Sequence, residues 1–163
     1  MRMIFVTAGT QEPFDRLVRA IDEYAGSHNI EIVVQALKGR YTPVNFELIP
    51  LLESKEFDLY MTRADVIVGH AGMGTILKSI EMGKPLIIMP RHKTLGEHRT
   101  DHQQDTVKRL PTLPNIRIVQ NRDELFSALD EGAALLNAGT VIKPDFSCVS
   151  EYIARFIGLN DNI

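Results

Sequence analysis

The chain has 163 residues, of which 44% are hydrophobic and 24% are charged, and its formal net charge is -3. This length and composition are typical of one soluble globular domain, so we expect a single domain over residues 1–163. The negative charge argues against a broad nucleic-acid-binding surface. No apolar run approaches the roughly 20 residues of a membrane-spanning helix.

The start of the sequence and its cysteine content favour a cytoplasmic location. The short apolar stretch 3–6 is not part of a longer apolar region followed by a cleavage site, as a secretory signal would be. Cys148 is the single cysteine, so no internal disulfide can form. We therefore expect a cytoplasmic protein that binds a small molecule rather than a polymer.

Strand-like and helix-like segments alternate along the chain. Apolar runs predict strands at residues 4–7, 30–36, 46–49, 66–68, 86–89 and 116–119. Helical spacing predicts a helix capped by Thr10 and further helices at residues 53–64, 73–82, 98–110, from 121 or 123 onward, and 148–158. This alternation predicts an α/β fold: a Rossmann-like, doubly wound parallel sheet of about six strands in the order 3-2-1-4-5-6, with helices on both faces.

In that strand order, the loops after the first and fourth strands lie side by side. Ala8-Gly9-Thr10-Gln11 follows the first strand, and Gly69-His70-Ala71-Gly72-Met73-Gly74-Thr75 follows the fourth. Both lead into expected helix N-termini, whose free amides and partial positive charge attract anions. Glycine also lets the backbone approach a phosphate closely. We therefore predict a site for a diphosphate or other anion, and we expect Gly72→Val to abolish nucleotide binding while preserving the fold.

Some of these glycines could have purely structural roles. Glycines after strands often serve only tight turns, and Gly83 before Pro85 is expected to end a helix. The spacing G-x-x-G-x-G differs from the dinucleotide fingerprint G-x-G-x-x-G, and no P-loop sequence is present, so NAD binding and P-loop ATPase activity are unsupported. His70 is expected either to contact the ligand or to bond the neighbouring loop.

A second polar cluster, RHKTLGEHRTDHQQ at residues 91–104, follows the fifth strand. We expect it to rim the same crevice, where the amides of Gln103 and Gln104 would suit sugar hydroxyls; a solvated polar helix start is the alternative. His98 and His102 are four residues apart on the expected helix. Arg99 replaces the Glu of a zincin, however, and no third ligand is fixed by spacing, so no metal site is expected.

Three stretches together resemble a known family: FVTAGTQEPFDRL, ADVIVGHAGMGTIL and GKPLIIMPRHKTLGEHRTDHQ. They resemble the donor-binding C-terminal half of GT-B glycosyltransferases of the MurG type, glycosyltransferase family 28. They are more similar still to small subunits that contain only this half. These are the catalytic subunit of the two-part dolichol-pathway UDP-N-acetylglucosamine transferase and bacterial PssE-type exopolysaccharide glycosyltransferases. The resemblance covers nearly the whole chain.

The resemblance implies a UDP-sugar-dependent glycosyltransferase with no cofactor and no metal. By position, it implies that Gly9 and Thr10 border the diphosphate and that Gln103 and Gln104 contact the donor sugar. The residues that it assigns to holding the nucleotide and its phosphates are His70, Ala71, Gly72, Gly74 and Thr75. Relatives often have a Glu that bonds ribose hydroxyls where this chain has Lys78, which leaves the choice of nucleotide open.

The resemblance also implies a partner. Two-domain relatives carry the acceptor site and the general base mainly in an N-terminal half that this chain lacks. We therefore expect a separate membrane-anchored subunit, a lipid-linked sugar acceptor, and action at the cytoplasmic membrane face, with little activity from this chain alone. The helix expected at residues 148–158 would dock that partner or pack on its own sheet. A non-catalytic nucleotide-binding or regulatory subunit and a stand-alone nucleotide-sugar epimerase or hydrolase remain alternatives.

Overall fold

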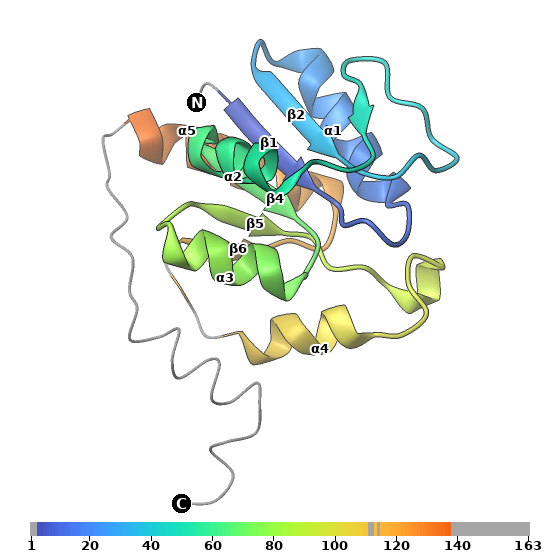
Figure 1. The fold of residues 1–163 in the computed structure, drawn as a ribbon. Coiled ribbons are helices and arrows are strands. Elements are labelled where there is room, and N and C mark those ends of the chain that lie inside the picture. The colour runs from blue at the N-terminus through green and yellow to red at the C-terminus, as the bar shows by residue number, and fades with distance from the viewer. Residues whose placement is uncertain (1–2, 111–112, 114, 138–163) are drawn as a thin grey trace, which may run out of the picture.

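The computed structural model describes residues 3–110, 113 and 115–137. Its centre is a six-stranded sheet in the order β3-β2-β1-β4-β5-β6, and every pairing is parallel (Figure 1). The strands are β1 (Met3–Thr7), β2 (Glu31–Gln35), β3 (Leu48–Ile49), β4 (Val66–Gly69), β5 (Leu86–Ile88) and β6 (Ile116–Ile118). The predicted doubly wound fold and its strand order are confirmed.

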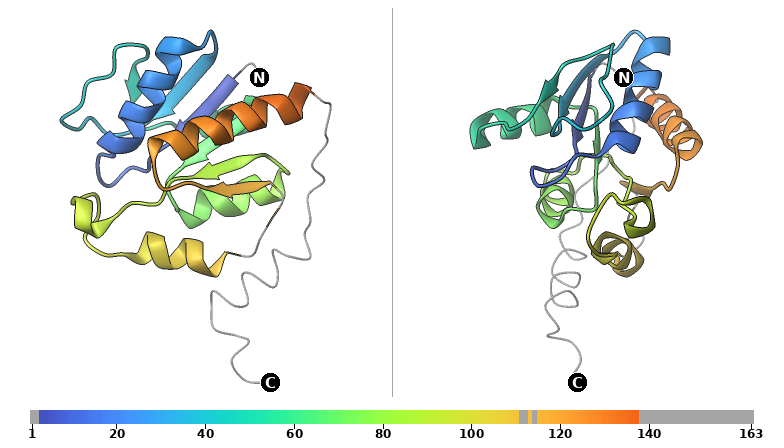
Figure 2. Two further views of the ribbon diagram at one scale, coloured as in Figure 1. Left: turned by 180° about the vertical axis from the view of Figure 1, so that it is seen from behind. Right: turned by 90° about the vertical axis from the view of Figure 1, so that its right-hand side faces the viewer.

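Helices cover both faces of the sheet (Figures 1 and 2). On one face lie α1 (Asp15–Ser27) and α5 (Arg122–Asn137), and on the other lie α2 (Ser54–Arg63), α3 (Met73–Glu81) and α4 (His102–Arg109). None of the helices within the described residues is long and apolar enough to cross a membrane. The helix expected at residues 148–158 lies outside the described residues.

The alternation of side chains along β1 explains the two-sided packing. Ile4 and Val6 join the core cluster that includes buried residues of α1 and α5, whereas Met3 and Phe5 join the cluster formed with α2, α3 and α4. Every residue of β1 is buried, as expected for the central strand of a sheet covered on both sides. Because the helices after β1 and β4 pack on opposite faces, the loops that precede them flank one crevice.

The first helix starts later than the sequence predicted. Thr10 does not cap it, because α1 begins at Asp15 with Phe14 in the capping position. Pro13 disfavours a helical conformation for the residue before it, and Gly9 has a φ of 83°. The backbone carbonyl groups of Ala8, Glu12 and Pro13 in this loop also accept hydrogen bonds from the buried side chain of Arg91. Residues 8–14 therefore form a fixed loop rather than a first helical turn.

Two other boundaries differ from the prediction. The helix expected from His98 begins at His102, because a 3-10 turn at Lys93–Leu95 ends at Gly96 with a φ of 70° and redirects the chain. The strand β3 is limited to Leu48–Ile49, shorter than the predicted 46–49, and Asn45 just before that range donates a hydrogen bond from its backbone amide to the side chain of Asp22. Gly83, with a φ of 62°, follows the end of α3, as predicted.

Candidate functional site: a pocket at the carboxyl ends of β1 and β4

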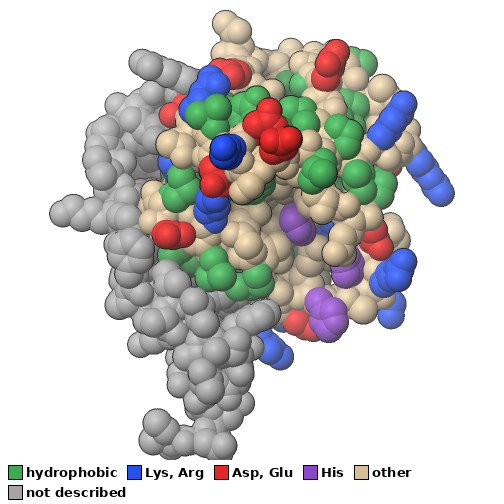
Figure 3. Space-filling model, viewed as in Figure 1, with side chains coloured by type: hydrophobic (Ala, Val, Ile, Leu, Met, Phe, Trp, Pro, Cys, Tyr) green, Lys and Arg blue, Asp and Glu red, His purple; other side chains and the backbone are tan. Residues whose placement is uncertain are grey.

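A pocket of about 340 Å³ opens where β1 and β4 end. Histidine side chains gather on this face of the molecule (Figure 3). The predicted residues that line the pocket come from three separate segments of the chain: Gly9, Thr10, His70, Gly72, Gly74, Thr75 and Gln103. The two glycine-bearing loops therefore meet as predicted. Two predicted residues, Ala71 and Gln104, are not part of the lining.

The imidazole of His70 occupies the space between the two loops. A Cβ atom on Gly9 would lie 3.0 Å from Cε1 of this ring, and a Cβ atom on Gly72 would lie 2.5 Å from its Nε2. Contacts below about 3.0 Å between such atoms require something to shift. Gly9 and Gly72 therefore provide room for a histidine ring, a role that was not predicted from the sequence.

The surroundings of His70 determine which ring nitrogen carries the proton and in which direction the pKa of the ring is shifted. Its Nδ1 lies 3.3 Å from the backbone oxygen of Thr7, which can only accept, so Nδ1 carries the proton and Nε2 is the acceptor in the neutral ring. Burial lowers the pKa of His70, and the charges of Arg91 and His98 add to this effect against the opposing bond to Thr7. At pH 7 the ring of His70 is therefore neutral.

Gly74 faces open space, unlike Gly72. A Cβ atom on Gly74 would meet no heavy atom within 4 Å, and the residue lies in the first turn of α3 at the edge of the pocket. Among the described residues no side chain caps the N-terminus of α3, and its first turn contains no acidic residue. The amides of a first helical turn lack intrahelical acceptors and carry partial positive charge. This end of α3 therefore has the geometry and the charge that suit a phosphate.

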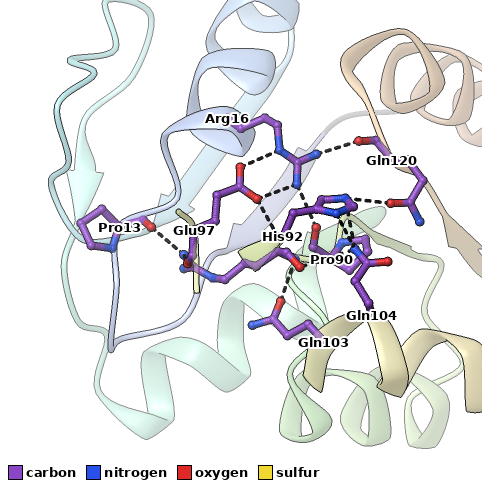
Figure 4. Close-up of polar contacts among 9 residues, drawn as sticks. Pro13, Arg16, Pro90, His92, Glu97, Gln103, Gln104 and Gln120 are labelled. Carbon is purple, nitrogen blue, oxygen red and sulfur yellow. Dashed lines mark hydrogen bonds and ion pairs between the residues drawn. The ribbon is translucent and has the colours of Figure 1, made fainter. Parts of the chain in front are cut away.

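Gln103 joins the two sides of the pocket. It is 9% exposed, and its Oε1 accepts hydrogen bonds from the backbone amides of Ala71, at 3.4 Å, and Arg91, at 3.0 Å. The oxygen is thus used to hold the glycine loop against the loop after β5. Gln104 points elsewhere: its Nε2 lies 3.1 Å from a ring nitrogen of His92, which in turn contacts Gln120 (Figure 4). The structure does not bring Gln104 to this pocket.

Arg91 is a pocket residue whose role was not predicted from the sequence. Its side chain is only 2% exposed, and its guanidinium group lies 4.4 Å above the ring centre of Phe14. Its two terminal nitrogens donate to four backbone carbonyl oxygens, those of Ala8, Glu12, Pro13 and Glu97. Burial lowers its pKa, and the nearby carboxylates of Glu12 and Glu97 oppose that effect. The only sequence signal was a basic residue immediately after a buried strand.

One electrostatic expectation needs correction. The sequence predicted that both loops lead directly into helix N-termini at the pocket, but α1 begins at Asp15, five residues beyond Thr10. The side chain of Asp15 is engaged by the backbone amide of Arg40 instead. Of the two helices that follow these loops, only α3 begins at the pocket itself, and on the β1 side the positive charge comes from the guanidinium group of Arg91.

Further lining residues were not predicted from the sequence. Thr7 and Gln35 end the neighbouring strands β1 and β2, and the hydroxyl of Thr7 donates to Oε1 of Gln35 at 3.4 Å. Gln35 is 4% exposed. Phe57 of α2 adds an aromatic wall. A polar residue at the end of an apolar strand was the available signal, because such a position faces the carboxyl edge of a parallel sheet.

Lys78 does not line the pocket. Its Nζ contacts the carboxylate of Asp58 on α2 and lies 5.9 Å from the ring centre of Phe57. His98 lines the pocket but precedes α4, so it does not share a helical face with His102. Within residues 3–110, 113 and 115–137, no three His, Cys, Asp or Glu side chains gather closely enough to hold a metal ion.

The comparisons with known sequences agree with one another on the family. The profile of the glycosyltransferase family 28 C-terminal domain matches residues 3–135. The chain is similar to the UDP-N-acetylglucosamine transferase subunit ALG13 of Homo sapiens, with 28% identity over 116 residues, which are 62% of this chain and 10% of the human protein. The subunit of the same name from Debaryomyces hansenii is 26% identical over 107 residues, covering 63% of this chain and 50% of that protein. The chain thus spans a tenth to a half of these relatives.

Solved structures agree with the fold. The crystal structure of the glycotransferase of kitacinnamycin superposes with a TM-score of 0.59 and 19% identity, covering 82% of this chain and 35% of that one. An NMR solution structure of ALG13 superposes with a TM-score of 0.57 and 18% identity, covering 88% of each chain. At these identities the likeness shows a shared fold.

Proposed function

This chain belongs to the glycosyltransferase family 28 C-terminal domain family, and from that membership we propose that it is the donor-binding, catalytic subunit of a glycosyltransferase that uses a UDP-sugar. The observation that carries the proposal is the pocket at the ends of β1 and β4, where α3 begins without a side-chain cap from the described residues and where Gly74 borders open space. Similarity to UDP-N-acetylglucosamine transferase subunits supports N-acetylglucosamine, or another hexose, as the transferred sugar.

The geometry supports a specific placement of the diphosphate. Its oxygens would lie at the first turn of α3, beside Gly74, with the hydroxyl of Thr75 and the loop at Gly9 and Thr10 close by. During transfer an acceptor hydroxyl attacks the anomeric carbon of the sugar, and negative charge grows on the departing diphosphate. Amides and a helix end that are already fixed toward this charge lower the barrier without reorganisation.

The acceptor hydroxyl must also lose a proton, and we propose that a second polypeptide supplies the base. That partner would be a membrane-anchored subunit that binds a lipid-linked sugar, so this chain would act at the cytoplasmic face of the membrane. Support comes from the relatives, which are described as subunits of a transferase. The test is transfer of radiolabelled sugar to a lipid-linked acceptor by the purified chain alone. Robust transfer by the isolated chain would refute the need for a partner.

Donor binding is tested by titration calorimetry with UDP, UDP-N-acetylglucosamine and other nucleoside diphosphates. We expect micromolar to millimolar binding of UDP and its sugars, and progressively weaker binding in Gly74→Ala and Gly74→Val, because each added atom enters the space beside the pocket. Both folds should be preserved, because a Cβ atom at this position meets no heavy atom within 4 Å and both alanine and valine have a higher helix propensity than glycine.

Gly96→Ala is the matched control. Gly96 also has open space around it but lies outside the pocket lining, so its variant should bind UDP as the wild type does. Because L side chains disfavour a φ of 70°, this variant should lose about 1–2 kcal/mol of stability. If no nucleotide binds the wild type, the donor-binding proposal is wrong. If Gly74→Val binds UDP as tightly as the wild type, the phosphate lies elsewhere.

A further inference from the structure

Arg91 is a buried cation in the wall of the pocket. It is 2% exposed, and the hydrogen bonds of its two terminal nitrogens all go to backbone carbonyl oxygens. Among the described residues it forms no ion pair. Burying a charge is costly unless an opposite charge lies close to it, and carbonyl dipoles compensate only part of that loss. Arg91 thus places a positive charge in the wall of the pocket.

The two acidic residues whose charges act on Arg91 form their ion pairs with other arginines. The carboxylate of Glu97 binds Arg16 through two hydrogen bonds of 2.7 and 2.9 Å (Figure 4). The carboxylate of Glu12 lies 3.6 Å from Arg99. In this network three guanidinium groups share two carboxylates, so one positive charge is in excess.

The excess charge acts on the pocket. Arg91 lines it together with Gly9 and His70, and its charge contributes to the lowered pKa of His70. It lies on the β1 side, where α1 begins too late to place its own N-terminus at the pocket. A buried charge is screened by salt much less than an exposed one. The effect of its charge on a ligand in the pocket should therefore depend only weakly on ionic strength.

We propose that Arg91 is a specificity-determining residue of the donor site, whose buried charge favours ligands in proportion to the negative charge that they bring into the pocket. This inference rests on the proposed donor binding and adds what selects a nucleoside diphosphate over a monophosphate or a free nucleoside. The two terminal nitrogens of Arg91 are already engaged by four carbonyl groups, so they act on a ligand through their charge rather than through new hydrogen bonds.

Arg91 has a second role that must be separated from the first. The same carbonyl contacts at Ala8, Glu12 and Pro13 hold the loop that carries Gly9. Arg91→Gln removes both the charge and the contacts. Arg91→Lys keeps the charge but loses most of the contacts, since an ammonium group cannot span four acceptors arranged for a planar guanidinium. Both variants should therefore melt at lower temperature than the wild type, and only the charge distinguishes them.

The test is titration calorimetry of the full chain with uridine, UMP and UDP at one ionic strength. UDP carries about one negative charge more than UMP. We expect the wild type to prefer UDP over UMP, and Arg91→Gln to reduce that preference by about tenfold or more, since tenfold corresponds to one charge pair about 12 Å apart at an effective dielectric constant near 20 and a shorter separation gives a larger effect. In Arg91→Gln the affinity for uridine should change less than the affinity for UDP. Arg91→Lys should keep the UDP preference within about twofold.

Arg99→Gln provides the control, because Arg99 belongs to the same network but its side chain is 91% exposed. We expect it to change the UDP preference less than twofold, since solvent screens its charge. Equal weakening of all three ligands in Arg91→Gln would show a structural role alone and overturn the inference, as would a wild type that binds UMP and UDP equally. If the Gln variant does not fold, loss of the preference in Arg91→Lys overturns the inference. Failure of the wild type to bind any nucleotide would instead refute the donor-binding proposal.

Discussion

A Cβ atom on Gly72 would lie 2.5 Å from Nε2 of His70, whereas a Cβ atom on Gly74 would meet nothing within 4 Å. The absence of a side chain thus serves a different purpose at each of these two glycines of one short loop. Gly72 leaves room for a buried ring, and Gly74 leaves the start of α3 open beside the pocket. The clash contradicts the expectation from sequence that Gly72→Val would leave the fold intact. Gly74 is the position at which ligand binding can be changed alone.

The contact between Gly72 and His70 predicts a loss of stability. Gly72→Ala should lower the free energy of unfolding by about 1–3 kcal/mol, because an added methyl group forces the imidazole out of its place. Denaturation by urea measures the loss. In the background of His70→Ala the same change should cost less than about 0.5 kcal/mol, since the clashing ring is absent. Equal costs in the two backgrounds would show that the backbone at Gly72, and not His70, limits the position.

The lowered pKa of His70 predicts a dependence of stability on pH. The unfolded chain binds a proton at this ring near pH 6.5, whereas the folded protein resists it until a lower pH. The contribution of His70 to stability is therefore complete above pH 6.5 and declines as the pH falls toward the lowered pKa of the folded state. The difference in unfolding free energy between the wild type and His70→Asn should shrink over that range.

Ligand binding should oppose the lowering of the pKa of His70. A diphosphate beside the ring favours the imidazolium form, so saturating UDP should raise the pKa. Titration of the ring nitrogens by NMR measures both states and identifies the tautomer, which we expect to carry its proton on Nδ1. A ring that titrates at or above pH 6.5 without ligand would contradict the assigned environment.

Ser79 offers a stabilising substitution. Its hydroxyl is fully buried in α3, and among the described residues it has no hydrogen-bond partner. Removing an unsatisfied buried polar group releases its desolvation penalty, so Ser79→Ala should raise the free energy of unfolding by about 1 kcal/mol. Thermal and urea denaturation check this value. Ser127→Ala on the exposed surface of α5 should change stability by less than about 0.5 kcal/mol, and a destabilised Ser79→Ala would show that the hydroxyl has a partner in solution.

The environment of Asp22 predicts that the protein loses stability in acid. This buried carboxylate accepts hydrogen bonds from the hydroxyl of Tyr41 and from the amides of Val44 and Asn45. Burial acts to raise its pKa, but these bonds together outweigh burial and lower it. Its contribution to stability is therefore present above pH 3.8, its ordinary pKa, and is lost as the pH falls through the lowered value of the folded state.

Asp22→Asn should destabilise the protein at pH 7 by about 2–3 kcal/mol, because it removes charge-assisted bonds that hold residues 41–45 on α1. Urea denaturation at pH 7 and at pH 3 measures the effect, and the difference from the wild type should be smaller at pH 3. Glu31→Gln, which removes one exposed ion pair with Arg63, should cost less than about 1 kcal/mol. A constant difference between the wild type and Asp22→Asn across this range would exclude the proposed role of the charge.

Sequence reasoning succeeded where each signal was local and repeated. Apolar runs such as Ile4–Thr7 and Val66–Val68, separated by helical spacing, determine a parallel sheet whose central strands are buried on both faces. The strand order then places the loop at Gly9 beside the loop at Gly72. The helix start at Thr10 was wrong, because the local preference for a cap was outweighed by contacts that the loop makes with a distant residue.

By itself, then, the sequence determined the sheet, its order and the meeting of two glycine-bearing loops, because these follow from periodicity and chain connectivity. Only the tertiary structure decided what the glycines accommodate and where the pocket obtains its charge. The bond from Arg91 to the carbonyl of Ala8 joins residues 83 positions apart, and the contact of His70 with Thr7 joins residues 63 positions apart. Such pairs leave no periodic pattern, since they form only when packing brings two loops together.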